Sequence, residues 1–275
     1  MRTILITGCS SGIGLDAART LAARGWRVFA TCRQPEDCAR LAAEGLESFP
    51  LDLADEAGVA AAVATALQRS EGRIDALFNN GAFAIPGAVE DLSRAALREI
   101  LEVNLIGQVD LTNRILPAMR ARGEGRVVMT SSVLGYVAAP WRGAYVATKY
   151  ALEGITDALR LELHGTGISV SLIEPGPIGT AFRQNAVRRF EAHIDWRTSS
   201  HAAEYERTLL KRLYAPEGRK DRFELPASAV TRKLIHAVES PRPAARYRVT
   251  LPAHAAALMR RLLPTRMIDR VLRER

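Results

Sequence analysis

The sequence predicts an α/β fold in which helices cover both faces of a doubly wound parallel sheet, giving three layers. Short apolar runs alternate with longer helical stretches through residues 2–174, and the runs themselves are nearly continuous in apolar character. Strands of that kind are buried on both faces, as in parallel sheets covered by helices. A glycine-rich turn also separates the first strand from the first helix, as this fold class commonly requires.

Each predicted strand is a short apolar run that ends at a turn or at polar residues. The strands are expected at Arg2–Thr7, Trp26–Thr31, Leu46–Leu51, Ile74–Asn79, Arg126–Ser131 and Ile168–Glu174. The helices between them are expected at Gly14–Arg24, Pro35–Ala43, Asp55–Ser70, Ser93–Arg122 and Ala144–His164. Gly25 ends the first helix, and Pro117 is predicted to bend the fourth.

The alternation becomes irregular after Pro175. Residues 182–222 form a polar, charged and irregularly helical segment. A helix at Ala227–Ser240, a strand at Tyr247–Leu251 and a basic amphipathic helix at Ala253–Leu272 are expected to follow. Because no linker or repeat marks a boundary, we predict one domain over residues 1–275. Its regularly alternating part would occupy 1–182, and the irregular segment with the C-terminal extension 183–275.

The composition excludes several classes of protein. With 48% hydrophobic and 25% charged residues, the chain can bury a core and does not resemble a disordered protein. Its three cysteines have no paired spacing, and no His/Cys cluster appears, so we expect neither a disulfide framework nor a metal site. We also expect no signal peptide and no membrane-spanning segment, and therefore a cytoplasmic protein.

The formal net charge is +8, and much of it lies near the end of the chain. Nine arginines between Ser240 and Arg275 are opposed only by Asp269 and Glu274. Two interpretations remain open: a solvated helix face, or peripheral contact of the basic helix with an anionic membrane. Nucleic acid is not an expected partner, because no aromatic residues are interleaved to stack on bases.

The glycine-rich turn has the chemistry of a phosphate cradle. It reads Thr7-Gly8-Cys9-Ser10-Ser11-Gly12-Ile13-Gly14 between a strand and a helix. Glycines let the backbone approach a pyrophosphate, and the helix N-terminus supplies free N–H groups and a positive dipole.

The second strand ends without the acidic residue that usually binds the ribose 2′-hydroxyl of NAD. Arg33 stands there instead, and a guanidinium fits a 2′-phosphate, which favours NADP(H). The alternative is an ordinary surface arginine. Asp52 ends the third strand, where its carboxylate can accept a hydrogen bond from adenine or cap the next helix.

A tyrosine and a lysine share one helix face, since Tyr145 and Lys149 are four residues apart. A nearby ammonium stabilises phenolate and lowers its pKa, so Tyr145 is a candidate general acid and base. Ser132 follows the fifth strand and can hold a substrate oxygen beside the phenol.

Five motifs occur in order: Thr7–Gly14, Asn79-Asn80-Gly81-Ala82, Ser132, Tyr145 with Lys149, and Pro175–Thr180. In this combination the chain resembles the classical short-chain dehydrogenase/reductase family from about Arg2 to Phe182. The strand end at Ala30–Arg33, the segment Gly176–Phe182 and the long C-terminal extension are most similar to its hydroxysteroid and retinol dehydrogenase branch. The resemblance implies a Rossmann-type fold and a homodimer or homotetramer. It also implies that 1–182 is the cofactor-binding and catalytic core and 183–275 the substrate-side segment and C-terminal extension.

The resemblance also implies roles for single residues. Tyr145 would be the acid and base, Lys149 would lower its pKa and hold the nicotinamide ribose, Ser132 would orient the carbonyl, and Asn104 would hold a relay water. Asn104 can instead be a helix-interior asparagine that bonds to backbone. The cofactor would contact Gly8, Ser10, Ser11, Gly12, Ile13, Gly14, Arg33, Asp52, Leu53, Asn80, Tyr145, Lys149, Pro175, Gly176, Ile178 and Thr180. The family commonly reads Asn-Asn-Ala-Gly where this chain has Gly81 and Ala82 in the last two places.

Apolar side chains flank the predicted reacting centre. Besides Ser132 and Tyr145, the candidate substrate contacts are Leu134, Tyr136 and Phe182, with Val137 and Trp141 as either pocket walls or core residues. We therefore predict an NADP(H)-dependent oxidoreductase for a hydrophobic carbonyl compound, such as a steroid, a retinoid or a fatty aldehyde. The alternative is a non-catalytic sensor or regulator that binds NADP(H).

Overall fold

The computed structural model describes residues 1–216 and 221–273 and confirms the predicted parallel sheet. Seven strands lie in the order β3-β2-β1-β4-β5-β6-β9, and every neighbouring pair is parallel. Their bounds are β1 Thr3–Ile6, β2 Arg27–Cys32, β3 Glu47–Pro50, β4 Ala76–Asn79, β5 Gly125–Thr130, β6 Ile168–Glu174 and β9 Arg246–Arg248. The strand order reverses direction between β1 and β4, which makes the sheet doubly wound.

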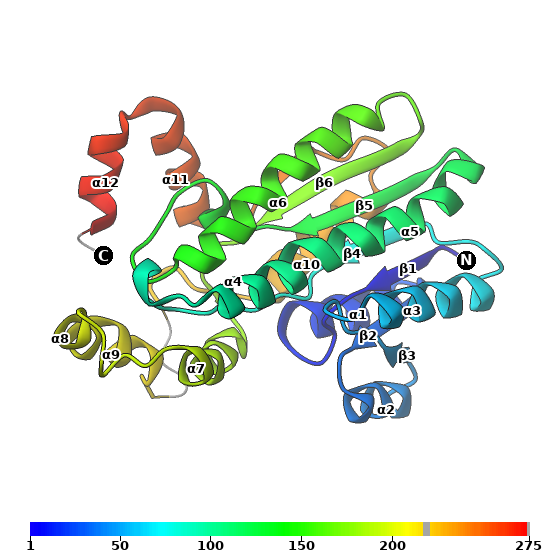
Figure 1. Cartoon of the computed structure of the whole chain (residues 1–275). Helices are drawn as coiled ribbons and strands as arrows, with labels where there is room; N and C mark the ends of the chain where they lie inside the picture. Colours follow the sequence, from blue (N-terminus) through cyan, green and yellow to red (C-terminus); the bar gives the residue numbers. More distant parts are fainter. Residues whose placement is uncertain (217–220, 274–275) are drawn as a thin grey trace.

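Helices cover both faces of this sheet, as Figure 1 shows. One face is covered by α1 (Gly12–Ala23), α2 (Pro35–Ala43) and α10 (Ser228–Glu239). The other is covered by α3 (Glu56–Arg69), α5 (Gly107–Arg122) and α6 (Gly143–Glu162). Alternate residues of one strand point into the two apolar cores. Ile4 and Ile6 of β1 pack on the side of α1, α2 and α10, and Leu5 packs on the side of α3, α5 and α6.

The long helix expected at Ser93–Arg122 is interrupted near its middle. It comprises α4 (Arg94–Leu101), a π-helical stretch η2 (Glu102–Ile106) and α5. Pro117 lies inside α5 without ending it. A π-helical stretch inside an α-helix is frequent at functional sites, and here it contains Asn104.

Two sequence predictions near the C-terminus were wrong. The last strand ends at Arg248, and Leu251 begins α11 (Leu251–Leu262), because Thr250 caps that helix by accepting a hydrogen bond from the Ala253 N–H. The single helix expected at Ala253–Leu272 is two helices, α11 and α12 (Thr265–Arg273). Pro264 explains the break, since proline has no N–H and keeps the preceding residue out of the helical conformation.

The segment predicted as irregular packs a third apolar cluster at the carboxyl ends of the strands. It contains α7 (Phe182–His193), α8 (Ala202–Glu204), η4 (Tyr205–Leu209) and α9 (Leu210–Leu213). Two short helical turns also lie at this end. The first, η1 (Val89–Asp91), is bonded to the segment through Ser199, and the second, η3 (Val133–Gly135), packs against α6 and α11. A two-stranded sheet of β7 (Ile178–Gly179) and β8 (Leu225–Pro226) was not predicted. Figure 1 shows α7–α9 and the α11–α12 pair on separate sides of this end. None of the helices in the described ranges is long and apolar enough to cross a bilayer.

Candidate functional site

The glycine-rich turn lies at the carboxyl end of β1, beside the point where the strand order reverses. Gly8 and Gly12 have φ angles of +71° and +59°, which favour glycine. At Gly14 an added Cβ would lie 2.2 Å from the Gly8 carbonyl oxygen. No side chain fits at these positions, so the loop presents backbone alone, and this is the form that a pyrophosphate-binding loop needs.

The remaining loop residues predicted to contact the cofactor lie around this backbone. Ser11 is exposed at the N-cap of α1, and its side chain makes no capping bond. Ile13 packs partly against the first apolar core. The Ser10 carbonyl accepts a hydrogen bond from Arg40 Nη2 at 2.7 Å.

The segment after β4 holds the loop in place. Thr7 Oγ1 accepts hydrogen bonds from the N–H groups of Asn80 and Gly81, both at 2.9 Å. Asn80 Nδ2 donates back to the Thr7 carbonyl at 3.1 Å. Gln108 Nε2 donates to the Gly81 carbonyl at 2.9 Å. An alanine Cβ at Gly81 would come within 3.3 Å of Leu53, a tight contact, so the Gly-Ala order here gives the loop slightly more room.

The segment after β6 lies against the same loop from the other side. A Cβ at Gly12 would be 3.0 Å from Thr180 Cγ2. Pro175 is buried, and Ile178 is half-buried in β7. Gly176 lies so close to Thr250 that its Cβ would be 2.2 Å from the threonine hydroxyl. The structure therefore brings the first and last predicted cofactor segments together.

The predicted adenosine-side residues lie at the ends of β2 and β3. Arg33 is exposed just after β2. Asp52 Oδ1 accepts from the Ala54 N–H at 3.0 Å, and the N-cap of α3 is Asp55 rather than Asp52. Leu53 is buried, and its carbonyl is in close contact with Gly107.

The tyrosine, lysine and serine meet at the carboxyl end of β5. Lys149 is buried, and its Nζ donates to the Thr130 carbonyl at 2.7 Å and lies 5.6 Å from the Tyr145 ring centroid. Ser132 is buried and accepts from the Leu134 N–H at 3.1 Å. The Tyr145 ring packs edge-on against Phe182, 5.5 Å between centroids.

Burial dominates the titration of this group. It raises the pKa of Tyr145 to about 12, while the Ser132 hydrogen bond and the charge of Arg142 act in the opposite direction. Burial also lowers the pKa of Lys149 to about 7, and the carboxylate of Glu153 acts against this. At neutral pH Tyr145 is therefore a neutral phenol with a proton to donate.

Asn104 uses its side chain to hold the loop after β4. Its Oδ1 accepts from the Phe83 N–H at 3.0 Å, and its Nδ2 donates to the Phe83 carbonyl at 2.8 Å and to Thr148 Oγ1 at 3.3 Å. Asn104 is completely buried in the π-helical stretch. The contact to Thr148 joins it to the helix turn that carries Tyr145 and Lys149.

The other predicted substrate contacts do not all lie at the Tyr145 site. Leu134 is half-buried in η3, within reach of the Ser132 hydroxyl. The Tyr136 hydroxyl donates to the Ala253 carbonyl of α11 at 2.8 Å. Tyr136 and the buried Val137 line a cavity of about 350 Å³ whose other walls come from residues 138–140, Tyr150 of α6, α11 and α12. This cavity does not include Tyr145.

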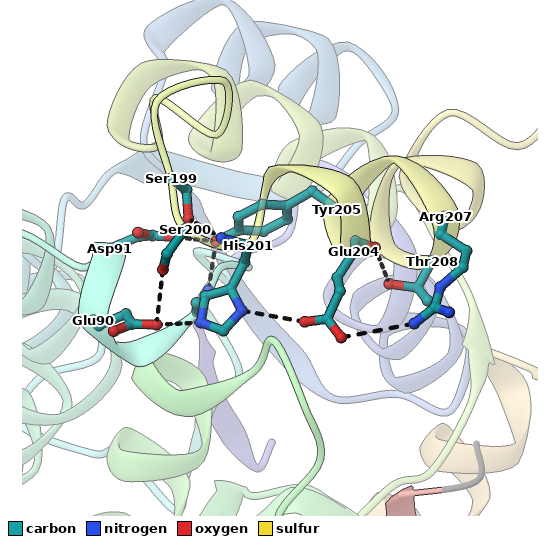
Figure 2. A network of polar contacts seen from close by, with 10 residues as sticks. Glu90, Asp91, Ser199, Ser200, His201, Glu204, Tyr205, Arg207 and Thr208 are labelled. Atoms are coloured by element: carbon teal, nitrogen blue, oxygen red, sulfur yellow. Dashed lines mark hydrogen bonds and ion pairs between the residues drawn. The ribbon is translucent and has the colours of Figure 1, made fainter.

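A polar network ties the α7–α9 segment to η1 (Figure 2). The buried Tyr205 hydroxyl donates to Asp91 at 2.5 Å and accepts from the Ala88 N–H at 2.6 Å. His201 lies between Glu90 and Glu204. The Trp141 ring packs against Tyr205, 5.1 Å between centroids, and is partly buried against the third apolar cluster. No sequence pattern indicated this network, because the partners of Tyr205 and His201 lie far away in the chain.

Sequence reasoning also missed three charged residues near the site. Arg40 holds the glycine-rich loop from α2. Arg142 precedes Tyr145 by three residues and acts on its titration. Glu153, which faces Lys149, pairs with Arg246. The spacing of Arg142 and Glu153 from the Tyr145–Lys149 pair was the only available signal.

Comparison with known proteins gives consistent similarities. A family model described as short chain dehydrogenase matches residues 2–190. An uncharacterized oxidoreductase of Escherichia coli K12, YbbO, is 41% identical over 98% of this chain and 94% of its own length. Human 17-beta-hydroxysteroid dehydrogenase type 1 is 36% identical over 90% of this chain and 77% of its own. The solved structure of an actinorhodin polyketide ketoreductase variant with NADPH is 30% identical, with a TM-score of 0.73 over 90% of this chain and 95% of that one.

Proposed function

Because this chain belongs to the short-chain dehydrogenase family and is therefore an oxidoreductase of carbonyl and alcohol groups, we propose that it acts on hydrophobic substrates with NADP(H). The similarity to a human hydroxysteroid dehydrogenase confirms the branch that the motifs predict. The proposed substrates are steroids, retinoids, fatty aldehydes or similar ketones. One observation carries the proposal: a partly buried, protonated Tyr145 lies beside Ser132 and Lys149 at the sheet edge that holds the glycine-rich loop.

The proposed chemistry assigns each side chain one task. Bound NADP(H) supplies the hydride for reduction or accepts it in oxidation. Ser132 donates a hydrogen bond to the substrate oxygen and fixes it near the phenol. Tyr145 gives its proton to that oxygen as the alcohol forms. Lys149, with a pKa of about 7, adds positive charge beside the phenol and stabilises the phenolate that results.

Asn104 is proposed to hold Tyr145, Ser132 and Lys149 in place through contacts to neighbouring residues. Its contacts to Phe83 and Thr148 fix the loop after β4 against the Tyr145 helix. A relay water beside Asn104 would connect to Lys149 through groups at the end of β5. We propose Leu134 and Phe182 as the apolar contacts of the substrate and Tyr136 as a more distant wall.

The preference for NADP(H) is proposed from two arginines. Arg33 is exposed at the end of β2, with no acid between Ala30 and Arg33 to bind a 2′-hydroxyl. Arg40 holds the Ser10 carbonyl close by, so a second guanidinium flanks the same loop. The NADPH-bound ketoreductase supports this choice by similarity. Arg33→Ser should raise KM for NADPH but leave KM for NADH unchanged, and Arg261→Ser on α11 is a control that should change neither.

The function is tested by measuring NADPH consumption with a panel of hydrophobic aldehydes and ketones, with NADH in parallel. NADPH-selective turnover supports both the reaction and the cofactor. If no turnover occurs, the alcohol-oxidising direction is assayed with NADP. Tight NADP(H) binding without turnover in either direction would instead favour a sensor that reads the cofactor ratio.

We also propose a homodimer or homotetramer and a cytoplasmic location. Light scattering of the purified protein would measure its mass directly. A monomer at micromolar concentration would contradict the first proposal.

Contact with an anionic membrane is a second proposal for the two C-terminal helices. Leu251, Leu258, Leu262, Met267 and Val271 are exposed on α11 and α12. Arginines at 260, 261, 266 and 270 share these helices. Exposed leucines beside arginines suit the interface of an anionic bilayer. Flotation with anionic vesicles tests this, since binding should weaken as salt rises, and no binding at low salt would contradict it.

A further inference from the structure

Titratable side chains recur at every fourth position along one face of α6. The members of this α6 series are Tyr145, Lys149, Glu153 and Asp157. Side chains four residues apart are neighbours on a helix surface. Exposure increases along the series: Lys149 is 1% exposed, the Glu153 side chain 10% and the Asp157 side chain 39%. The series therefore extends from the proposed reacting centre to solvent.

A short path of contacts connects the buried members of the α6 series. Lys149 Nζ donates to the Thr130 carbonyl at 2.7 Å, and the next residue of the chain is Ser131. A Cβ added to Gly135 would lie 2.5 Å from Ser131 Oγ and 3.1 Å from Glu153 Oε1, so these two oxygens lie close together. Ser131 thus joins the residue that holds Lys149 to the Glu153 carboxyl.

The two oxygens beside Gly135 have unused hydrogen-bonding capacity. Ser131 Oγ and Glu153 Oε1 are both buried, and neither has a hydrogen-bond partner within residues 1–216 and 221–273. Buried polar atoms are nearly always paired with protein groups or with ordered water. A hydroxyl and a carboxyl oxygen placed in this way suit proton transfer, because each can accept a proton from a neighbour directly or through one water.

One arginine holds the outer half of the α6 series. Arg246 of β9 pairs through Nη1 with Glu153 and through Nη2 with Asp157, the latter at 2.6 Å. Its Nη1 also bonds to the buried Glu174 of β6 at 2.8 Å. A guanidinium does not release its proton in proteins. Arg246 therefore keeps the two carboxyl groups of α6 side by side without carrying a proton itself.

Burial brings the titration of the inner members closer together. It raises the pKa of Glu153 from its usual value and lowers the pKa of Lys149 to about 7. The charged and titratable groups around Glu153 and its neighbour Glu174 are Lys149 and Asp157 of α6, Arg246 and Arg248 of β9, and Tyr136 after η3. Proton transfer is most efficient between groups of matched pKa, so these shifts favour exchange between Lys149 and Glu153.

We propose that Ser131, Glu153 and Asp157 carry protons between solvent and Lys149, and so resupply Tyr145 after each reduction. The inference rests on the proposed carbonyl reduction. Each turnover moves a hydride from NADPH to the carbonyl carbon and a proton from Tyr145 to the carbonyl oxygen, so the phenolate must regain one proton from solvent. That proton enters at Asp157, passes through Glu153 and Ser131 to Lys149, and returns to Tyr145.

The test separates the first turnover from later ones by stopped-flow measurement of NADPH oxidation with an active hydrophobic aldehyde. In the first turnover Tyr145 already holds its proton, so Glu153→Gln should react within about twofold of the wild-type rate. Later turnovers need a new proton, so their rate should fall by about 100-fold, at the lower end of what general acid–base groups contribute. KM should stay unchanged. A side chain with a purely structural role would slow both phases alike.

Other variants locate the effect along the α6 series. Glu153→Asp keeps a carboxyl group and should recover part of the steady-state rate. Asp157→Asn should cause a smaller loss, again confined to later turnovers, because water reaches this exposed end. Glu162→Gln, at an exposed acid on the same helix, is the matched control and should change neither phase. Thermal unfolding shows whether each variant is folded.

The outcomes separate the proton path from the reaction. Unchanged steady-state turnover in both Glu153→Gln and Asp157→Asn would leave the proton with a water beside Asn104 and overturn the proposal. So would a loss in Glu153→Gln that is equal in the first and later turnovers. If Glu153→Gln does not fold, Asp157→Asn decides by the same two criteria. Absence of turnover by the wild-type protein in either direction would instead refute the proposed reaction itself.

Discussion

Replacing Gly14 with alanine tests whether the glycine-rich loop has the structural role described above. The new Cβ would lie 2.2 Å from the Gly8 carbonyl oxygen and 2.9 Å from Asn80 Nδ2. Because Asn80 Nδ2 donates to the carbonyls of both Thr7 and Gly8, the loop would have to move by roughly 1 Å, an overpacking that costs about 1–3 kcal/mol. For a chain of this size each kcal/mol lowers Tm by roughly 2–4 °C.

The loop movement should also weaken the binding of the cofactor. We expect Kd for NADPH to rise by about tenfold or more, equal to about 1.4 kcal/mol. Calorimetric titration with NADPH and thermal unfolding with and without it measure both effects.

Gly154→Ala is the matched control for this substitution. Gly154 is exposed inside α6 and has nothing within 4 Å of an added Cβ, so alanine should stabilise the helix by about 0.5–1 kcal/mol and leave NADPH affinity unchanged. If Gly14→Ala keeps both the wild-type Tm and the wild-type affinity, the argument from the close approach of the loop is refuted.

Three further predictions concern charge and buried polar groups. Glu153→Gln removes a negative charge that raises the Lys149 pKa, so the limb of the pH–rate profile due to Lys149 should move to lower pH; an unmoved limb would contradict this. Tyr205→Phe strips a partner from Asp91 and should lower the free energy of unfolding by about 1–3 kcal/mol in urea titration, and no change would contradict the network. The carboxylates of Glu204 and Glu90 raise the pKa of His201. The stabilisation that the protonated His201 gives the folded state is therefore complete at low pH and is lost as pH rises through that raised pKa. His201→Gln should remove this dependence from thermal unfolding scans, and a dependence that persists would assign it to another group.

Local sequence signals predicted the sheet and its order of elements well. The apolar runs became β1–β6 with boundaries moved by only a few residues, because strands buried on both faces leave a clear hydrophobic pattern. The glycines at 8, 12 and 14 were identified because their role depends on backbone conformation, which the residue type itself encodes.

The C-terminal third was less predictable because its structure depends on contacts between distant residues. Apolar periodicity continued across Pro264, so α11 and α12 were read as one helix. The pairing of β7 with β8 joins segments more than forty residues apart and involves only two residues of each. The network of Tyr205, Asp91 and His201 likewise links residues separated by more than a hundred positions.

In the candidate site, too, local patterns could be predicted from the sequence and three-dimensional contacts could not. Tyr145, Lys149 and Ser132 were proposed from spacing and from their place after a strand, and the structure places them together. Arg142 was overlooked, because an arginine before a helix usually lies in solvent and its effect on Tyr145 is visible only in three dimensions.

The most direct test of the central claim is the Tyr145→Phe variant, assayed with NADPH and an active aldehyde beside a fluorescence titration of NADPH. The account predicts that turnover falls by at least about 100-fold, as expected for loss of a general acid, while Kd for NADPH stays within about twofold. Undiminished turnover would contradict the assignment of Tyr145 as the proton donor. Loss of NADPH binding in a folded variant would show that the phenol serves the cofactor instead of the reaction.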